Sequence, residues 1–193
     1  IVWGAIVNDS RTLVRQTLLF ARDTSQNSGA TQDLIKQMGY RQIGFCYALG
    51  QSLRDKDAYA AAENFLDMDE QSFVKGHTNV PNALLLLHNK TLRALFYSHK
   101  INAYQQMQLD TTLVHLCNSM GQCERIKNTV FPTMYSLIVR LFLYLFTLLL
   151  PFGLANYFSI LEVPIVVVVA SLFFLIEKSS LYLQKPFDDK PTD

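Results

Sequence analysis

The strongest constraint on the fold is a long apolar run near the C-terminus, over residues 136–155. Arg140 is its one charged side chain, and leucine, phenylalanine and tyrosine fill every position from 141 to 146. An α-helix of about 20 residues is about 30 Å long, which matches the hydrocarbon thickness of a bilayer. A helix on the surface of a soluble protein would keep one polar face, and this run has none. The sequence therefore predicts a transmembrane helix here.

A second apolar run follows after a short connection. It covers residues 165–176 and includes four consecutive valines, while Glu162 and Pro164 just before it are typical of a helix start. The uncharged stretch is short for a membrane span, but a helix that begins near Phe158 reaches about 19 residues. We predict a second transmembrane helix. The alternative, a buried hairpin in a soluble protein, fits poorly because the first run is apolar on all sides.

Apart from Arg140, the basic residues of this region lie outside the two runs, and none lies between them. Arg125 and Lys127 precede the first run, and Lys178 follows the second, with further lysines at 185 and 190. Lysine and arginine favour the cytoplasmic side of a membrane. We therefore expect both ends of this chain to be cytoplasmic in a multi-pass protein. Arg140 lies near that edge, where it can reach the interface or pair with an acid.

Residues 1–133 show helical periodicity, with almost no alternation of the kind that marks strands. A break is expected at residues 25–29, and Asn79 with Pro81 signals a helix start. The fold class is all-α, with a helical cytosolic region over 1–133, a transmembrane hairpin over 134–178 and a C-terminal segment over 179–193. The predicted soluble helices cover residues 2–22, 32–53, 82–99 and 103–127, with short helices near 59–66 and after Asp69.

The last of these helices carries one regular apolar stripe. Its members recur every three or four residues, as expected for a helix that packs on one side. We interpret the stripe as ordinary packing in a helical bundle. It consists of Leu109, Leu113, Leu116, Met120 and Cys123.

The sequence gives no support for nucleic-acid binding or for the common classes of catalytic site. The formal net charge is +1, so no basic surface for nucleic acid is indicated. The motifs of serine hydrolases, zinc proteases, P-loop proteins and dinucleotide-binding proteins are missing. We therefore expect neither an enzyme nor a bound cofactor.

A metal site is not expected either. The three cysteines have no metal-binding spacing and are interpreted as reduced thiols. His88 and His99 could share one helix face, but no further ligand has suitable spacing. The acids Asp67, Asp69 and Glu70 are interpreted as an acidic loop rather than a calcium loop.

The segment Gly-Gln-Cys-Glu-Arg-Ile at 121–126 and the segment Leu-Leu-Pro-Phe-Gly at 149–153 follow one another along the chain. Together with matches upstream, they resemble the bestrophin family, most closely its bacterial members of the YneE type. The segment 121–126, which contains Cys123, Glu124 and Arg125, resembles the approach to the family's third transmembrane helix. Further matches upstream are Trp3 with Gly4, the segment 11–15 and the segment 79–82. The remaining signature positions are Thr129, Pro132, Tyr135, Pro151, Pro186 and Phe187.

The resemblance implies a homopentameric channel that passively conducts chloride or other monovalent ions across a bacterial inner membrane. It implies four transmembrane helices per subunit, and so the chain is expected to be a fragment without the first two. Eukaryotic members bind calcium after their Pro-Phe pair. Calcium is not carried over, because Lys185 and Lys190 occupy positions where oxygen ligands would be needed.

The family also has a constriction at its cytosolic mouth, which the resemblance places at Tyr104 and Met107. A ring of such side chains would gate by size and dewetting. The alternative is that both side chains pack between helices. For the whole protein, the alternative function is a membrane-anchored helical interaction protein without conduction, with a membrane enzyme ranked third.

Overall fold

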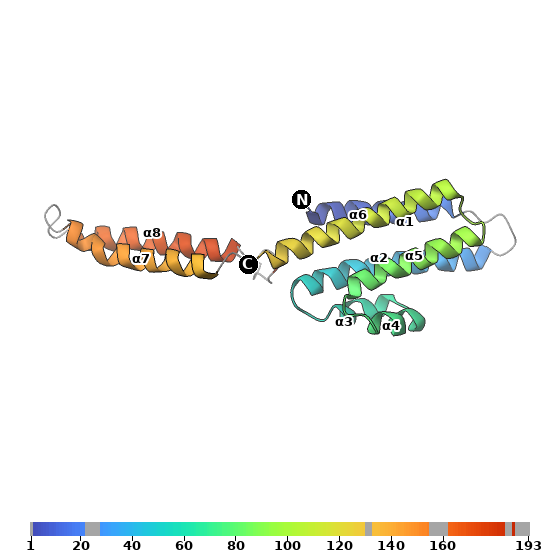
Figure 1. Cartoon of the computed structure of the whole chain (residues 1–193), viewed down its shortest axis with the longest axis horizontal. Helices are drawn as coiled ribbons and strands as arrows, with labels where there is room; N and C mark the ends of the chain where they lie inside the picture. Colours follow the sequence, from blue (N-terminus) through green and yellow to red (C-terminus); the bar gives the residue numbers. More distant parts are fainter. Residues whose placement is uncertain (1, 22–27, 130–132, 155–161, 184–186, 188–193) are drawn as a thin grey trace. The chain divides into compact units, whose positions relative to one another are not determined.

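The computed structural model describes residues 2–21, 28–129, 133–154, 162–183 and Phe187. These residues are almost entirely helical and include no strand, which confirms the predicted all-α class (Figure 1). The helices are α1 (Val2–Phe20), α2 (Ser28–Leu53), α3 (Ala58–Ala62), η1 (Glu63–Phe65), α4 (Met68–Lys75), α5 (Val80–Tyr97), α6 (Ala103–Asn128), α7 (Thr133–Leu154) and α8 (Glu162–Leu183).

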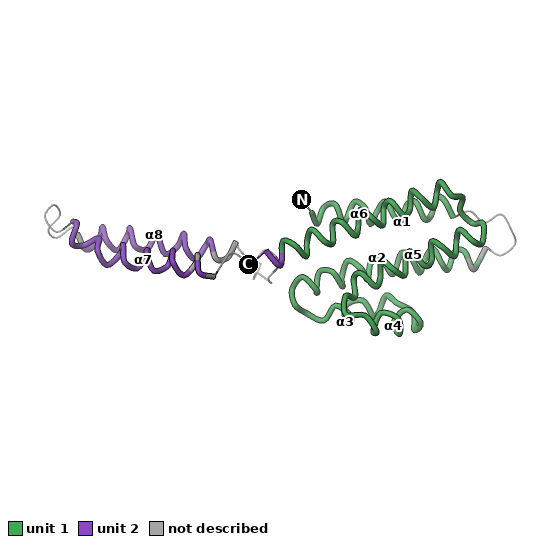
Figure 2. The backbone as a smooth tube through the Cα atoms, in the orientation of Figure 1, with its two compact units in different colours: residues 1–126 green, residues 127–193 purple. Residues whose placement is uncertain are grey.

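The chain divides into two compact units, unit 1 (Ile1–Ile126) and unit 2 (Lys127–Asp193), shown in Figure 2. In unit 1, α2 is central, because it contacts α1, α3, η1 and α5. Helix α6 lies beside α1, and the hydroxyl of Thr112 donates a hydrogen bond to Oε1 of Gln16 at 2.8 Å. The division of roles into cytosolic region, hairpin and C-terminal segment stays a prediction.

Side-chain caps set the helix starts in the middle of unit 1. Asp57 caps α3 by accepting from the backbone N–H groups of Tyr59 and Ala60. Asp67 caps α4, and Asn79 caps α5 with a proline in the first turn. Such caps satisfy donors that have no partner within the helix.

Two sequence predictions are wrong in this part. The predicted acidic loop is the cap and first turn of α4, because a carboxylate at a helix N-terminus is stabilised by the helix dipole. The helix expected from residue 32 begins at Ser28, so the expected break at 25–29 is shorter on its C-terminal side. Residues 22–27 lie outside the described part of the chain.

The predicted apolar stripe of α6 is confirmed. Its five members are between 0% and 5% exposed. Leu109 and Leu116 are fully buried, and so are Phe45 and Leu49 of α2 and Leu84 of α5. Burying a leucine side chain contributes roughly 1.5–3 kcal/mol, so this stripe is a main source of stability in unit 1.

In unit 2, α7 and α8 pack side by side (Figure 2). Tyr144 meets Phe174 with ring centroids 5.6 Å apart, and Phe146 meets Phe173 at 5.3 Å. Among the described residues one segment, Val163–Ser180 of α8, is long and apolar enough to cross a membrane. The apolar segment of α7 is the shorter Leu137–Gly153, so the first predicted span rests on the sequence argument.

Candidate functional site

The start of α6 is capped by two hydrogen bonds. The side chain of Asn102 accepts the backbone N–H of Gln105 at 2.8 Å, and the side chain of Gln105 accepts that of Asn102 at 3.0 Å. This reciprocal pair is a capping box, which fixes the first turn of a helix. Ile101, just before it, is 4% exposed and anchors the turn in the core. The preceding turn places His99 at a φ of 56°.

Tyr104 and Met107 stand one turn apart on this fixed start. They are 63% and 60% exposed and lie on the side of α6 opposite its buried stripe. Unit 1 therefore does not pack them between its own helices. Their role as a constriction stays a prediction, for which the structure supplies two exposed large side chains in a defined place.

At the other end of α6, Glu124 joins two of the sequence motifs. Its Oε1 accepts a hydrogen bond from Nδ2 of Asn79 at 3.2 Å, and Oδ1 of Asn79 accepts the backbone N–H of Asn82 at 3.0 Å. One asparagine thus caps α5 and holds the end of α6. The Asn-Val-Pro-Asn and Cys-Glu-Arg motifs, far apart in the sequence, are brought together here.

The other signature residues are spread over the chain rather than gathered in one place. Arg125 and Thr129 lie on the surface near the end of α6. Pro151 lies inside α7, and Phe187 is half-buried. Tyr135 lies in the first turn of α7, whereas Pro132 and Pro186 fall outside the described residues.

An ion pair links the two helices of unit 2. The Nε and one terminal nitrogen of Arg140 both donate to Oε1 of Glu177, at 3.0 and 2.9 Å. Arg140 is 48% exposed and Glu177 19%. Of the two outcomes left open for Arg140, reaching the interface or pairing, the structure shows pairing.

A buried polar cluster in unit 1 was not anticipated from the sequence. Arg41 of α2 donates through Nε to Oε1 of Glu70 at 2.7 Å, and a second guanidinium nitrogen contacts the same oxygen. A third nitrogen donates to the hydroxyl of Thr91 at 3.0 Å. Arg41 is 2% exposed and Glu70 4%. The cluster ties α2, α4 and α5 together, so we regard it as support for the fold.

His88 lies one turn before Thr91 and is fully buried. Neither ring nitrogen has a hydrogen-bond partner among the described residues. Burial and the nearby Arg41 charge hold the pKa of His88 well below its ordinary value. His99 lies beyond the end of α5 and is exposed, so the two histidines do not share a site. Within the described ranges, no three His, Cys, Asp or Glu side chains are placed to hold a metal.

A pH dependence of stability follows from His88. Because the folded state lowers its pKa, the unfolded chain binds more protons. The His88 contribution is present above an unfolded pKa of about 6.5 and is lost as pH falls below it. We expect His88→Leu to make the fall in thermal midpoint between pH 7.5 and 5.5 shallower, measured on the full-length protein in detergent.

The quantity to compare is the change in thermal midpoint between pH 7.5 and 5.5, measured in wild type and in His88→Leu. Burial raises the pKa of Glu70, so protonation of Glu70 acts in the opposite direction and is common to both proteins. Equal slopes in wild type and His88→Leu would contradict the assignment.

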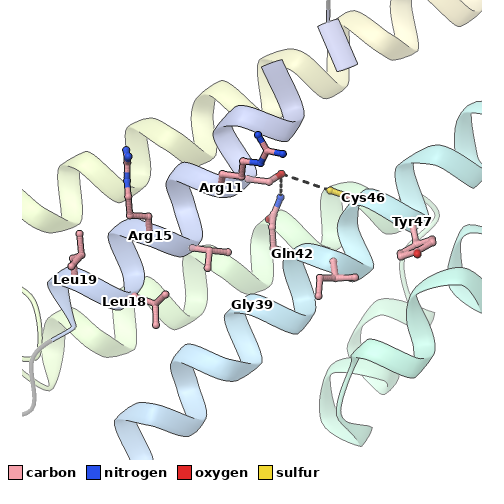
Figure 3. A pocket seen from close by; sticks show the side chains of 11 residues that line it. Arg11, Arg15, Leu18, Leu19, Gly39, Gln42, Cys46 and Tyr47 are labelled. Atoms are coloured by element: carbon pink, nitrogen blue, oxygen red, sulfur yellow. Dashed lines mark hydrogen bonds between the residues drawn. The ribbon is translucent and has the colours of Figure 1, made fainter. Parts of the chain in front are cut away.

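An apolar groove lies between α1 and α2 (Figure 3). It has a volume of about 590 Å³, and its lining includes the aliphatic side chains of Leu18 and Ile43 together with the polar side chains of Ser10 and Gln42. Ser10 accepts a hydrogen bond from Nε2 of Gln42 at 2.8 Å and lies 3.7 Å from the sulfur of Cys46. Burial raises the pKa of the Cys46 thiol, so it is not an activated nucleophile.

Comparisons with known proteins agree on one family. The family described as Bacterial/Fungal Bestrophin protein matches residues 1–193. A voltage-dependent anion channel-forming protein of Ralstonia nicotianae is 27% identical over 192 residues, which cover 100% of this chain and 61% of that protein. A protein of the same description from Nostoc sp. is 26% identical over 191 residues, 99% of this chain and 61% of that protein.

A solved structure of a bacterial bestrophin homologue also matches this chain. The crystal structure of a mutant bacterial bestrophin homologue from Klebsiella pneumoniae matches with a TM-score of 0.88 at 26% identity. The match covers 100% of this chain and 69% of that chain. The chain spans about 61% of the length of the two relatives named above.

Proposed function

Because the chain belongs to the bacterial and fungal bestrophin family, we propose that it is part of a channel subunit that passively conducts small monovalent ions. The relatives are named as voltage-dependent anion channel-forming proteins, which favours chloride among the candidate ions. The subunits form a homopentamer in a bacterial inner membrane. Both ends of this chain face the cytoplasm, in keeping with the distribution of basic residues.

The observation that carries the proposal is the exposed pair at the start of α6. Tyr104 and Met107 are large, mostly exposed and held on a capped helix turn. In a monomer, both side chains would leave most of their apolar surface in contact with water. In a pentamer with α6 near the axis, five copies form a narrow apolar ring at the cytosolic mouth, which limits passage by size and dewetting.

The basic test is ion flux into liposomes that contain the purified full-length protein. We expect flux of chloride or another monovalent ion, and a mass in detergent that corresponds to five subunits. Absence of flux for all monovalent ions tested, with a monomeric mass, would instead favour the membrane-anchored interaction protein.

A variant tests the constriction. Tyr104→Ala removes the phenol ring, so we expect a severalfold rise in flux and greater permeability to large ions, because the ring of five becomes wider. The measurement is single-channel current in planar bilayers. Met68→Ala is the matched control, since Met68 is 87% exposed but belongs to α4. Unchanged current and ion size limit in Tyr104→Ala would remove this residue from the constriction.

A further inference from the structure

The groove between α1 and α2 has the size and the walls of a site for a small apolar ligand. Its volume of about 590 Å³ lies within the range of ligand pockets in proteins, roughly 300–1,000 Å³. Val14 and Leu18 of α1 and Ile43 of α2 supply apolar walls. Gly39 leaves part of the wall bare, because a Cβ atom added there would meet nothing within 4 Å. An apolar chain can therefore lie against α2 at this position.

A buried polar group in the lining of this groove lacks a partner. Gln42 is 3% exposed, and its Oε1 accepts no hydrogen bond from the described residues. Its Nε2 donates to Oγ of Ser10 at 2.8 Å, and that hydroxyl donates to the backbone oxygen of Ile6 at 2.6 Å. Because the hydroxyl proton is used for Ile6, the amide presents its nitrogen to Ser10 and keeps its oxygen for another donor. Buried acceptors of this kind are normally satisfied by protein, water or a ligand.

Two arginines of α1 border the same groove (Figure 3). Arg11 and Arg15 are exposed, and neither forms an ion pair with a carboxylate among the described residues. They are four positions apart, on one face of the helix, so both guanidinium groups can contact a single anion. Arginine binds phosphate and carboxylate groups well, because its planar fork matches their oxygens.

These features lie in a definite order along the groove. Arg11 directly follows Ser10, the hydrogen-bond partner of Gln42, so the charge and the free acceptor lie at the same end. Leu18 is about two turns further along α1. Since α1 and α2 run in opposite directions (Figure 1), Leu18 lies on the Gly39 side of Gln42. The groove is therefore polar and positively charged at one end and apolar at the other.

We propose that this groove binds a single-chain phospholipid with an anionic head, of the lysophosphatidic acid class. The phosphate pairs with Arg11 and Arg15, the free glycerol hydroxyl donates to Oε1 of Gln42, and the acyl chain lies past Gly39 towards Leu18. The charge of the arginines selects an anionic head, and the apolar end selects a lipid over free phosphate. This binding site is separate from the constriction and does not depend on the proposed channel function.

Lipid binding is measured by native mass spectrometry of the full-length protein in detergent, titrated with oleoyl lysophosphatidic acid. We expect saturable binding of up to one lipid per subunit. Oleoyl lysophosphatidylcholine has the same chain, but its choline group offsets the phosphate charge, so it should bind severalfold more weakly. Glycerol 3-phosphate has the head without the chain, and it should not bind measurably.

Two variants test the two ends of the groove. Gly39→Leu fills the bare wall and should weaken binding about tenfold or more, because displacing even two CH₂ groups from an apolar site has that effect. It should fold, since leucine is a better helix former than glycine. Gly4→Leu is its control, because Gly4 is exposed in α1 with open space around it and is not part of the lining. The double variant Arg11→Gln, Arg15→Gln should bind severalfold more weakly, whereas Arg93→Gln on α5 should bind as wild type does.

The proposal is overturned if wild type shows no saturable binding, if lysophosphatidylcholine binds equally well, or if Gly39→Leu binds as tightly as wild type. A different occupant has its own signature. If wild type binds no lipid and Gly39→Leu lowers the mass of the assembly, a neighbouring subunit fills the groove instead. Because no ion flux is measured, failure of the channel function would leave this result readable.

Discussion

Replacing Arg41 with methionine is expected to lower the free energy of unfolding by about 3–5 kcal/mol, because it leaves a buried carboxylate without its partner. Both guanidinium contacts to Oε1 of Glu70 are lost, together with the hydrogen bond to Thr91. The other oxygen of Glu70 has no partner among the described residues, so nothing nearby replaces the lost donors. The measurement is denaturant or thermal unfolding of the full-length protein in detergent.

Two further variants separate charge from packing. Lys36→Met likewise removes a positive charge, but from an exposed residue of α2, and we expect it to alter stability by no more than about 0.5 kcal/mol. The double variant Arg41→Met, Glu70→Leu removes both buried charges and should recover most of the loss. If the double variant were as unstable as Arg41→Met, lost packing rather than an unpaired charge would be the cause.

The buried side of α6 could be predicted from the sequence, because the signal for it lies within the helix itself. Leu109, Leu113 and Leu116 follow the helical period, and a period identifies a buried side without knowledge of what covers it. The starts of α5 and α8 were predicted for a similar reason, since caps and first-turn prolines act within one turn. The start of α2 was missed because Ser28 and Gly29 were interpreted as part of a loop.

The buried cluster could not be predicted, because it depends on long-range placement. Arg41 and Glu70 are separated by 29 positions, and His88 lies on a third helix. Each of these residues is common on protein surfaces, and the sequence does not show which charged side chain will be enclosed. The three neighbouring acids at 67–70 suggested a solvated loop, although one caps a helix and another pairs with Arg41.

The candidate site residues could be predicted in part. The resemblance identified Tyr104 and Met107, and the structure shows that they are exposed on a capped turn. The link between Asn79 and Glu124 could not be predicted from the two motifs, because no local rule pairs residues 45 positions apart. Assembly between subunits decides what the exposed side of α6 faces, and a single chain carries no such information.

The second large effect is expected in unit 2, where Glu177→Leu leaves Arg140 without its partner in an apolar hairpin. Arginine at the centre of a membrane helix costs about 2.5–3.5 kcal/mol on insertion scales. Arg140 lies about two turns from the start of α7, from where its long side chain can reach the membrane surface, so we expect a smaller loss, about 1–3 kcal/mol. The measurement is the unfolding free energy of the full-length protein in bicelles.

The matched variant is Arg140→Leu together with Glu177→Leu, which removes both charges and should be at least as stable as wild type in lipid. Arg140→Leu alone leaves the Glu177 carboxylate without its partner, and it should be less stable than the double variant. If Glu177→Leu were as stable as wild type, the guanidinium would have to be hydrated at the membrane surface, where an exposed ion pair contributes little. That result would place Arg140 at the membrane surface. The apolar part of α7 inside the membrane would then begin after Arg140, one turn later than the apolar run that starts at residue 136.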